Sequence, residues 1–267
     1  MATGYTPTSG DHAIAAVTVL GLVASSVCLG GHRFGQRIWQ RIGAYRAIMA
    51  ALNRVGRCIL IAESTLVPLS IAAVWVWHQR PPEVLGLGLP TSLPALITLV
   101  VGVAWSLGIA VYCWNDVRHI RTCDDCRRAW HENIIKTYGR TPLELRRFPP
   151  YLGALQAVVE ELVFRGFLIW VLTPLLGIVG AVIAAALCFG IAHAASLRWA
   201  FFAMCAGLAL GTVYALTESL WGIMIAHATQ NVSVFLHHRA LAALPAPEPY
   251  TGATTGGSGT VHAVQSR

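Results

Sequence analysis

Charged residues are scarce in this chain of 267 residues. Asp, Glu, Lys and Arg together make up 12% of it, about half of the fraction that is usual in soluble domains. Hydrophobic residues make up 55%, and the mean hydropathy is +0.60. This composition argues against a soluble globular domain and predicts that the lipid bilayer is the surrounding solvent.

The sequence also has too little patterned cysteine for a disulfide framework. Most of its seven cysteines lie in or beside apolar runs, where cysteine behaves as a small hydrophobic residue. Cys123 and Cys126 differ, because they form a CxxC motif in a polar segment. No second pair lies nearby, so the motif by itself is weak support for a zinc site.

Long apolar runs, by contrast, are abundant. A membrane-spanning helix needs about 20 apolar residues, and the sequence predicts seven spans: 13–31, 58–78, 92–114, 151–173, 174–195, 199–217 and 219–238. No basic flank precedes the first run, so we expect it to be a retained span rather than a cleaved signal peptide. The predicted fold class is therefore all-α, a polytopic transmembrane helix bundle.

Short turns join the last four spans in pairs. The fourth and fifth spans are separated by a turn around Pro174, and the sixth and seventh by Thr217 and Glu218. Short connections make neighbouring helices antiparallel, so we expect these four spans to form one compact core.

Basic residues gather in alternate loops, so nearly all of them lie on one side of the predicted bundle. Residues 32–57 contain six arginines and residues 115–150 contain eight basic residues, whereas the segments on the opposite side contain only Arg80. The positive-inside rule then predicts a multi-pass protein of the cell membrane with its N-terminus outside and its C-terminus in the cytoplasm. We therefore interpret the net charge of +7 as a topology signal rather than a sign of nucleic-acid binding.

A few ionisable or strongly polar side chains lie inside the spans. Burial in lipid makes such groups costly, so each is a candidate for function. They are Glu63, Glu160, Glu161, Arg165, His193, His227 and Asn231. Glu63 lies near one end of its span, and we expect it to be interfacial or to pair helices.

The fourth span carries two adjacent carboxylates in the stretch AVVEELVFRGF, residues 157–167. Glu161 and Arg165 are four residues apart on one helical face, so we expect them to form an ion pair. Glu160 points about 100° away and lacks that partner. A purely structural ion pair accounts for Glu161 and Arg165 but leaves the second carboxylate unexplained.

Two histidine motifs lie in later spans. His193 follows Phe189 by four residues, and Asn231 follows His227 by four. Each pair alone also suits helix packing. In the predicted topology, however, these groups and Glu160 fall within about 12 Å in depth, in the cytoplasmic half of the bilayer. We therefore expect one pocket open to the cytoplasm, in which Glu160 acts as general base and then as acid.

These motifs resemble those of the CPBP (CAAX protease and bacteriocin-processing, Abi) family of intramembrane proteases, which includes the type II CAAX prenyl endopeptidases. The resemblance rests on EExxxR, FxxxH and HxxxN in this order, with TPLELRRF (141–148) and SLWGIMIAHATQN (219–231), and it covers roughly residues 83–238. It implies a catalytic membrane domain with a four-helix core (83–240). The N-terminal spans with their basic cytoplasmic loop (1–82) and a disordered cytoplasmic tail (241–267) lie outside the resemblance and are predicted from apolar runs, charge and composition.

The resemblance also implies an activity, that of a membrane-embedded endopeptidase cleaving membrane-anchored or lipidated, CAAX-like peptides. Glu160 and His193 would activate a water molecule, and His227 with Asn231 would stabilise the tetrahedral intermediate. The supporting residues would be Glu161, Arg165 and Phe189.

The resemblance leaves the cofactor open, because members of the family are described both as metalloproteases and as metal-independent glutamate proteases. If the reaction uses Zn²⁺, its ligands would be Glu160, His193 and His227, with one position left open. The sequence has no HExxH motif to supply paired ligands. We therefore favour metal-independent chemistry and assign no cofactor.

Two other classes of function stay open. A non-catalytic scaffold, or an immunity or regulatory protein, would keep the fold without needing both glutamates, both histidines and the asparagine. A proton-coupled transporter would use Glu and His as a relay, but such proteins usually show internal repeats and broken helices that this sequence lacks. The expected partners are the lipid bilayer and a membrane-associated substrate, with no nucleic acid.

Overall fold

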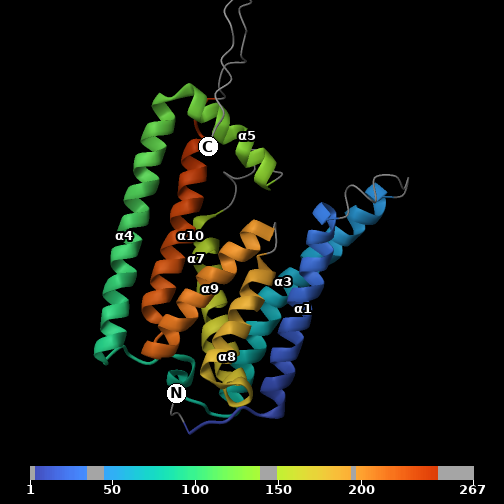
Figure 1. Ribbon diagram of the computed structural model, residues 1–267, viewed down its shortest axis with the longest axis vertical. Helices are drawn as coiled ribbons and strands as arrows, with labels where there is room; N and C mark the ends of the chain where they lie inside the picture. Colours follow the sequence, from blue (N-terminus) through green and yellow to red (C-terminus); the bar gives the residue numbers. More distant parts are fainter. Residues whose placement is uncertain (1–3, 35–44, 139–148, 194–196, 246–267) are drawn as a thin grey trace, which may run out of the picture.

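The computed structural model describes residues 4–34, 45–138, 149–193 and 197–245, and these residues form helices and no strand (Figure 1). In chain order the elements are α1 (Ser9–Phe34), α3 (Tyr45–Trp77), η1 (Pro82–Leu85), α4 (Leu93–Thr122), α5 (Asp124–Tyr138), α7 (Pro150–Glu161), η2 (Leu162–Leu168), α8 (Ile169–Ala192), α9 (Leu197–Thr217) and α10 (Trp221–Leu241). The predicted all-α class is therefore confirmed for this part of the chain. The stretch 141–148 and the tail beyond residue 245 lie outside it.

Three helical stretches are long and apolar enough to cross a membrane, among the residues described. They are Leu93–Thr122, Pro150–Ala192 and Leu197–Thr217. The second has 43 residues, which is enough for two crossings. Shorter apolar helices occupy Ser9–Ala24 and Thr65–Trp77. A helical membrane bundle is thus confirmed, and the count of seven crossings stays a prediction.

A reversal at Gly177 folds the 43-residue stretch back on itself. Gly177 has φ 67° and ψ 167° in an otherwise helical stretch, three residues after Pro174. Only glycine adopts this backbone conformation readily, and no atom lies within 4 Å of where a Cβ would be. A side chain would have room at this position, so glycine is required because of the backbone conformation. The predicted turn between the fourth and fifth spans is confirmed here, and it returns His193 to the level of Glu160.

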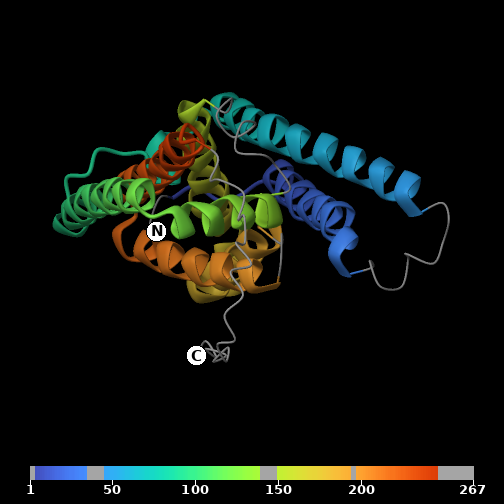
Figure 2. The same ribbon diagram turned by 90° about the horizontal axis from the view of Figure 1, so that it is seen from above.

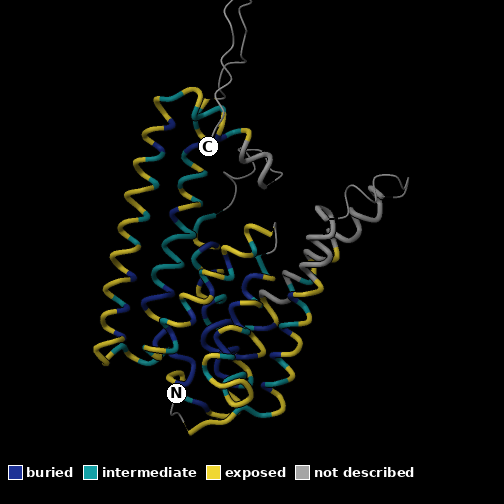
Figure 3. The backbone as a smooth tube through the Cα atoms, viewed as in Figure 1, coloured by how far each residue is buried: buried dark blue, intermediate teal, exposed yellow. Residues whose placement is uncertain are grey.

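The segment that follows Glu161 is a π-helix, η2. Single π-turns inside helices are rare and are frequent at functional sites. Six of its seven residues are buried, including Arg165 and Phe167. Figure 3 shows that buried residues concentrate in the half of the bundle where η1, η2 and α8 meet. The core therefore holds the end of α7 rigidly.

Helices α4 and α10 cross at very short range. A Cβ on Gly102 would lie 2.3 Å from the carbonyl oxygen of Gly222, and a Cβ on Gly222 would lie 2.3 Å from that of Thr98. Small residues allow this close approach of helix backbones, as is common in membrane bundles. The view from above shows α7 and α9 beside this pair (Figure 2). The crossing brings α10, which carries His227, against the rest of the bundle.

A buried ion pair joins the two N-terminal helices to the core. Arg80 donates to both carboxylate oxygens of Asp11 at 2.8 Å, and its guanidinium lies 5.0 Å from the ring centroids of both Trp75 and Trp170. Burial by itself would raise the pKa of Asp11, but hydrogen bonds from Arg80 and Thr8 outweigh it and hold that pKa below the usual 3.8. Arg80, the only basic residue in the segments opposite the basic loops, therefore has its charge neutralised by Asp11.

The Asp11 pair gives a pH-dependent contribution to stability. We expect Asp11→Asn to leave Arg80 buried without its counterion and to lower the free energy of unfolding by about 3–5 kcal/mol at neutral pH. Because the folded pKa of Asp11 is lowered, the pair stabilises fully above pH 3.8, and this contribution is lost as the pH falls through the folded value. Thermal unfolding in detergent at several pH values measures the difference from wild type.

The control for this prediction is Glu83→Gln, which removes an exposed carboxylate on η1. It should unfold as the wild type does at every pH. A Tm for Asp11→Asn equal to that of the wild type at neutral pH would contradict a stabilising role for the pair.

Candidate active site

The carboxylate of Glu160 lies in the last turn of α7 with its two oxygens in different environments. Oε1 accepts a hydrogen bond of 2.8 Å from Gln156 Nε2. Oε2 is buried and has no hydrogen-bond partner among the described residues. Buried polar atoms are usually satisfied, so such an atom needs an explanation. Gln156 was not among the predicted site residues, although its spacing of four from Glu160 was visible in the sequence.

Two imidazoles face this unsatisfied oxygen. His227 Nε2 lies 3.7 Å and His193 Nε2 lies 3.9 Å from Glu160 Oε2. His227 is on α10, and His193 is the residue that caps the C-terminus of α8. The structure thus brings together three predicted site residues from three separate helices.

Glu161 connects Arg165 to His227. Its side chain is 0% exposed, and its Oε1 lies 3.1 Å from Arg165 Nη1 and 2.6 Å from His227 Nδ1. The predicted ion pair with Arg165 is present. The contact with His227 was not predicted, because the two residues are 66 positions apart. Glu161 therefore holds a candidate catalytic imidazole as well as the arginine.

Both imidazoles are oriented through Nδ1. His227 Nδ1 faces the Glu161 carboxylate, and His193 Nδ1 lies 2.8 Å from the carbonyl oxygen of Phe189. A carbonyl and an ionised carboxylate can only accept, so we assign the proton of each neutral ring to Nδ1. Each Nε2 is then left with a lone pair on the side of Glu160.

Phe189 packs against the charged and polar groups of the site. Its ring centroid lies 4.3 Å from that of His193 and 6.3 Å from that of His227. Arg165 Cζ lies 4.3 Å from the same ring, a geometry that favours a cation over an aromatic face. The predicted supporting residue therefore fixes both imidazoles and the arginine in place.

Asn231 is placed differently from the other predicted residues. Its Nδ2 donates to the carbonyl oxygen of Gly153 at 3.2 Å, which fastens α10 to α7. An amide group has two hydrogens on this nitrogen, so one remains for another acceptor. Asn231 also lines the cavity next to His227.

A cavity of about 480 Å³ adjoins the site between α4, α9 and α10. His193, His227 and Asn231 are among its polar lining residues, together with Thr98 and Gln230. Most of the other lining side chains are apolar, among them Trp105, Trp199 and Phe202, which are more than half exposed. Glu160 does not line the cavity itself, but its Oε2 lies 3.7 and 3.9 Å from the Nε2 atoms of the two lining imidazoles. Cavities of this size and apolarity are typical of ligand sites.

The three possible zinc ligands do not all lie close enough together for one ion, although Glu160 Oε2 is 3.7 Å from His227 Nε2 and 3.9 Å from His193 Nε2. Zinc binds nitrogen and oxygen at about 2.0–2.2 Å, so two ligand atoms of one ion lie at most about 4.4 Å apart. The ligand atoms of Glu160, His193 and His227 do not form a group in which all lie within 4.8 Å of one another, although all three residues are described. A water molecule, with hydrogen bonds of about 2.8 Å, spans such a set more easily. The residues as arranged do not fit the metal.

A comparison with protein families identifies the segment that carries these residues. Residues 147–233 match the family described as type II CAAX prenyl endopeptidase Rce1-like. This match supports the assignment of residues 147–233 to the CPBP/CAAX protease family. The matched segment contains every candidate site residue from Glu160 to Asn231 and is shorter than the predicted extent of 83–238. No curated protein and no solved structure matches the chain.

The arrangement around Glu161 predicts a severe effect of removing Arg165. We expect Arg165→Ala to lower the free energy of unfolding by about 3–5 kcal/mol, because it leaves the buried Glu161 charge without its cation. Folded yield, measured as the monodisperse fraction after extraction in mild detergent, should fall accordingly. Arg198→Ala, which removes an exposed arginine on α9, is the matched control and should express as the wild type does. A stable, well-expressed Arg165→Ala protein would show that the pair is dispensable.

Proposed function

We propose that the protein is a membrane-embedded endopeptidase that hydrolyses membrane-associated or lipidated, CAAX-like peptides with a water activated by Glu160 and His193. One observation carries this proposal: Glu160 Oε2 is buried, lacks a partner among the described residues and faces two imidazole Nε2 atoms at 3.7 and 3.9 Å. A water between these atoms would satisfy the carboxylate oxygen and lie in a position to be deprotonated.

In the proposed reaction, the water donates hydrogen bonds to Glu160 Oε2 and to His193 Nε2. Glu160 accepts one proton as the water oxygen forms a bond to the carbonyl carbon of the substrate. When the tetrahedral intermediate collapses, the C–N bond breaks and Glu160 returns that proton to the leaving amine. Gln156, which donates to the other carboxylate oxygen, keeps Oε2 directed toward the water.

The developing oxyanion would be stabilised by His227 and Asn231. His227 donates from Nε2 when it is protonated, and the buried Glu161 carboxylate beside Nδ1 can compensate that positive charge. Asn231 has a second amide hydrogen beyond the one used on Gly153. The apolar cavity next to these groups suits a lipid chain or apolar side chains of the substrate.

The proposal predicts the effect of one isosteric substitution. We expect Glu160→Gln to lower the rate of cleavage by about 10²–10⁴-fold, the usual contribution of a general base, while the protein stays folded and inserted. The assay uses a fluorogenic prenylated peptide and a mixed pool of membrane peptides in liposomes, each with and without a strong chelator. Glu83→Gln, on exposed η1, is the control and should keep full activity.

Each outcome of this assay has a definite meaning. Full activity of Glu160→Gln would remove Glu160 from the mechanism. Activity that a chelator abolishes and Zn²⁺ restores would contradict the metal-independent reaction. Cleavage of no substrate by the wild type would favour the alternative function, a non-catalytic scaffold or an immunity or regulatory protein that retains the fold.

We further propose that the N-terminus lies outside the cell, that the C-terminus lies in the cytoplasm and that the site opens toward the cytoplasm. The end of α1, the start of α3 and helix α5 lie toward the same end of the bundle, opposite the reversal of α8 (Figure 1). These segments carry seven of the 19 Lys and Arg residues, and basic residues favour the cytoplasmic side.

A fusion experiment tests this orientation. A protease-sensitive tag at the C-terminus should resist protease added to intact cells and be cleaved after permeabilisation, and a tag at the N-terminus should be cleaved in intact cells. The reverse pattern would overturn the topology while leaving the proposed chemistry intact.

A further inference from the structure

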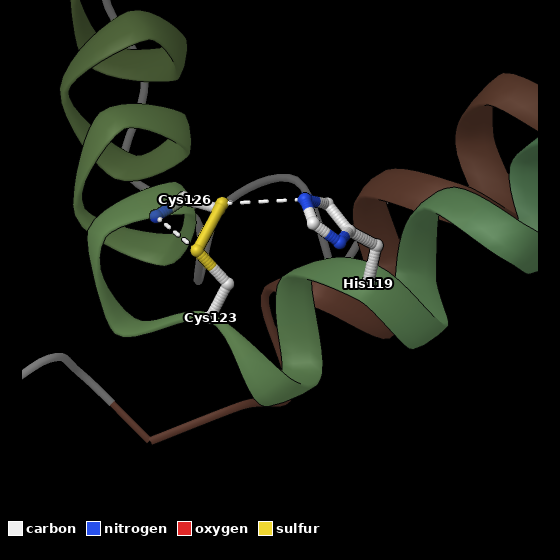
Figure 4. A group of neighbouring side chains, drawn as sticks. All are labelled: His119, Cys123 and Cys126. Atoms are coloured by element: carbon white, nitrogen blue, oxygen red, sulfur yellow. Dashed lines mark hydrogen bonds between the residues drawn. A yellow bond between two sulfur atoms is a disulfide. The ribbon is translucent and has the colours of Figure 1, made fainter.

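A cluster of three metal-ligating side chains lies at the corner between α4 and α5, outside the proposed active site. His119 is in the last turns of α4, Cys123 caps the end of that helix, and Cys126 is in the first turn of α5. One ligand atom from each residue lies within 4.8 Å of the others. In Figure 4 the imidazole of His119 faces the sulfur of Cys126, and the two sulfurs are joined as a disulfide. No other group of three such residues within the described segments is this compact.

The spacing of these atoms suits a thiolate–imidazole site. His119 Nε2 lies 3.4 Å from Cys126 Sγ. In a tetrahedral zinc site, with Zn–S of about 2.3 Å and Zn–N of about 2.0–2.1 Å, a sulfur and a nitrogen ligand are separated by about 3.6 Å. One edge of a coordination tetrahedron is therefore already present. A dithiol reductant would break the S–S bond by thiol–disulfide exchange, would itself be oxidised to a disulfide, and would leave both sulfurs free as ligands.

Donor and charged groups lie around both cysteines. The backbone N–H of Cys126 donates to Cys123 Sγ at 3.2 Å, and both cysteines lie at the N-terminus of α5, where the helix dipole is positive. Arg118 and Arg121 precede the pair by a few residues. Asp124 and Asp125, the nearest acidic groups in the sequence, are engaged by Arg127 and Arg128.

We propose that reduced Cys123 and Cys126, together with His119, bind one Zn²⁺ ion with its fourth position open to water. Zinc is the borderline-soft ion that mixed thiolate and imidazole ligands select in tetrahedral sites. His119 is exposed, which leaves the open position accessible. This proposal does not rest on the protease function, because none of the three residues takes part in the proposed reaction.

An ion bound by this cluster would affect how α5 packs on α4 and on the end of α10. Cys126 packs against a small apolar cluster of Val117, Ile120, Trp130 and Leu241. These residues come from α4, α5 and the last turn of α10, and His237 of α10 lies 2.7 Å from Asp116 of α4 nearby. An ion at the corner fixes the angle between α4 and α5, and it thereby holds α5 against the end of α10, the helix that carries His227 and Asn231.

Binding of Co²⁺, a spectroscopic substitute for Zn²⁺, tests the proposal on the full chain in detergent. The protein is reduced with a phosphine, its free thiols are counted and Co²⁺ is titrated anaerobically. We expect one Co²⁺ per chain with sulfur-to-metal charge-transfer bands and the strong visible bands of a tetrahedral site, all bleached by Zn²⁺. Cys123→Ser/Cys126→Ser should lose these bands, whereas Cys205→Ser, which removes an exposed cysteine on α9, should keep them.

The imidazole is tested separately. His119→Gln should weaken Zn²⁺ binding, measured in competition with a chromophoric chelator, by at least about 10- to 100-fold, the loss usual even for a residue that only supports a ligand. Helical content and elution volume confirm that each variant is folded. Absence of the bands in fully reduced wild type, or their survival in the double serine variant, would overturn the proposal. Re-formation of the Cys123–Cys126 disulfide in excess Zn²⁺ would also overturn it. The two cysteines would then be a redox-active pair that binds no metal.

Discussion

The carboxylate of Glu161 is the constraint on which the site depends. A charge with no exposure in an apolar bundle is very costly unless it is compensated, and Glu161 is compensated from two directions, by Arg165 one turn along its own helix and by His227 on α10. The first contact neutralises the charge locally. The second ties α10 to the junction of α7 and η2, so the same interaction that makes burial tolerable also sets where the His227 ring lies.

The two adjacent glutamates lie in different environments because they have different partners. Glu161 is enclosed, and its Oε1 is shared between Arg165 and His227. Glu160 is 14% exposed at its side chain, and it has one oxygen held by Gln156 and the other facing two Nε2 atoms. Neighbouring residues on a helix point about 100° apart. One carboxylate can therefore be structural while the next faces the space where a water would react.

Helix α10 is less apolar than the other long helices because it carries polar residues of the site. It carries His227, Gln230, Asn231 and the His237–His238 pair, and it is not among the helices apolar enough to be recognised as a span. Close packing on α4, where Gly102 and Gly222 bring the backbones together, and the hydrogen bond from Asn231 to Gly153 give these polar groups a protein environment. Helix α10 therefore packs on α4 and α7, and the apolar cavity opens beside it.

The sequence by itself determined the features that depend on local spacing. Apolar runs fixed the helical class, Pro174 and its neighbours marked the reversal found at Gly177, and the interval of four residues gave the Glu161–Arg165 pair. Convergence of Glu160, His193 and His227 followed from their predicted depth. Only the tertiary structure decided which atoms meet across helices: Glu161 with His227, Asn231 with Gly153 and Asp11 with Arg80. These partners are 66 to 78 residues apart, and helix rotation and crossing, which no periodicity encodes, bring them together.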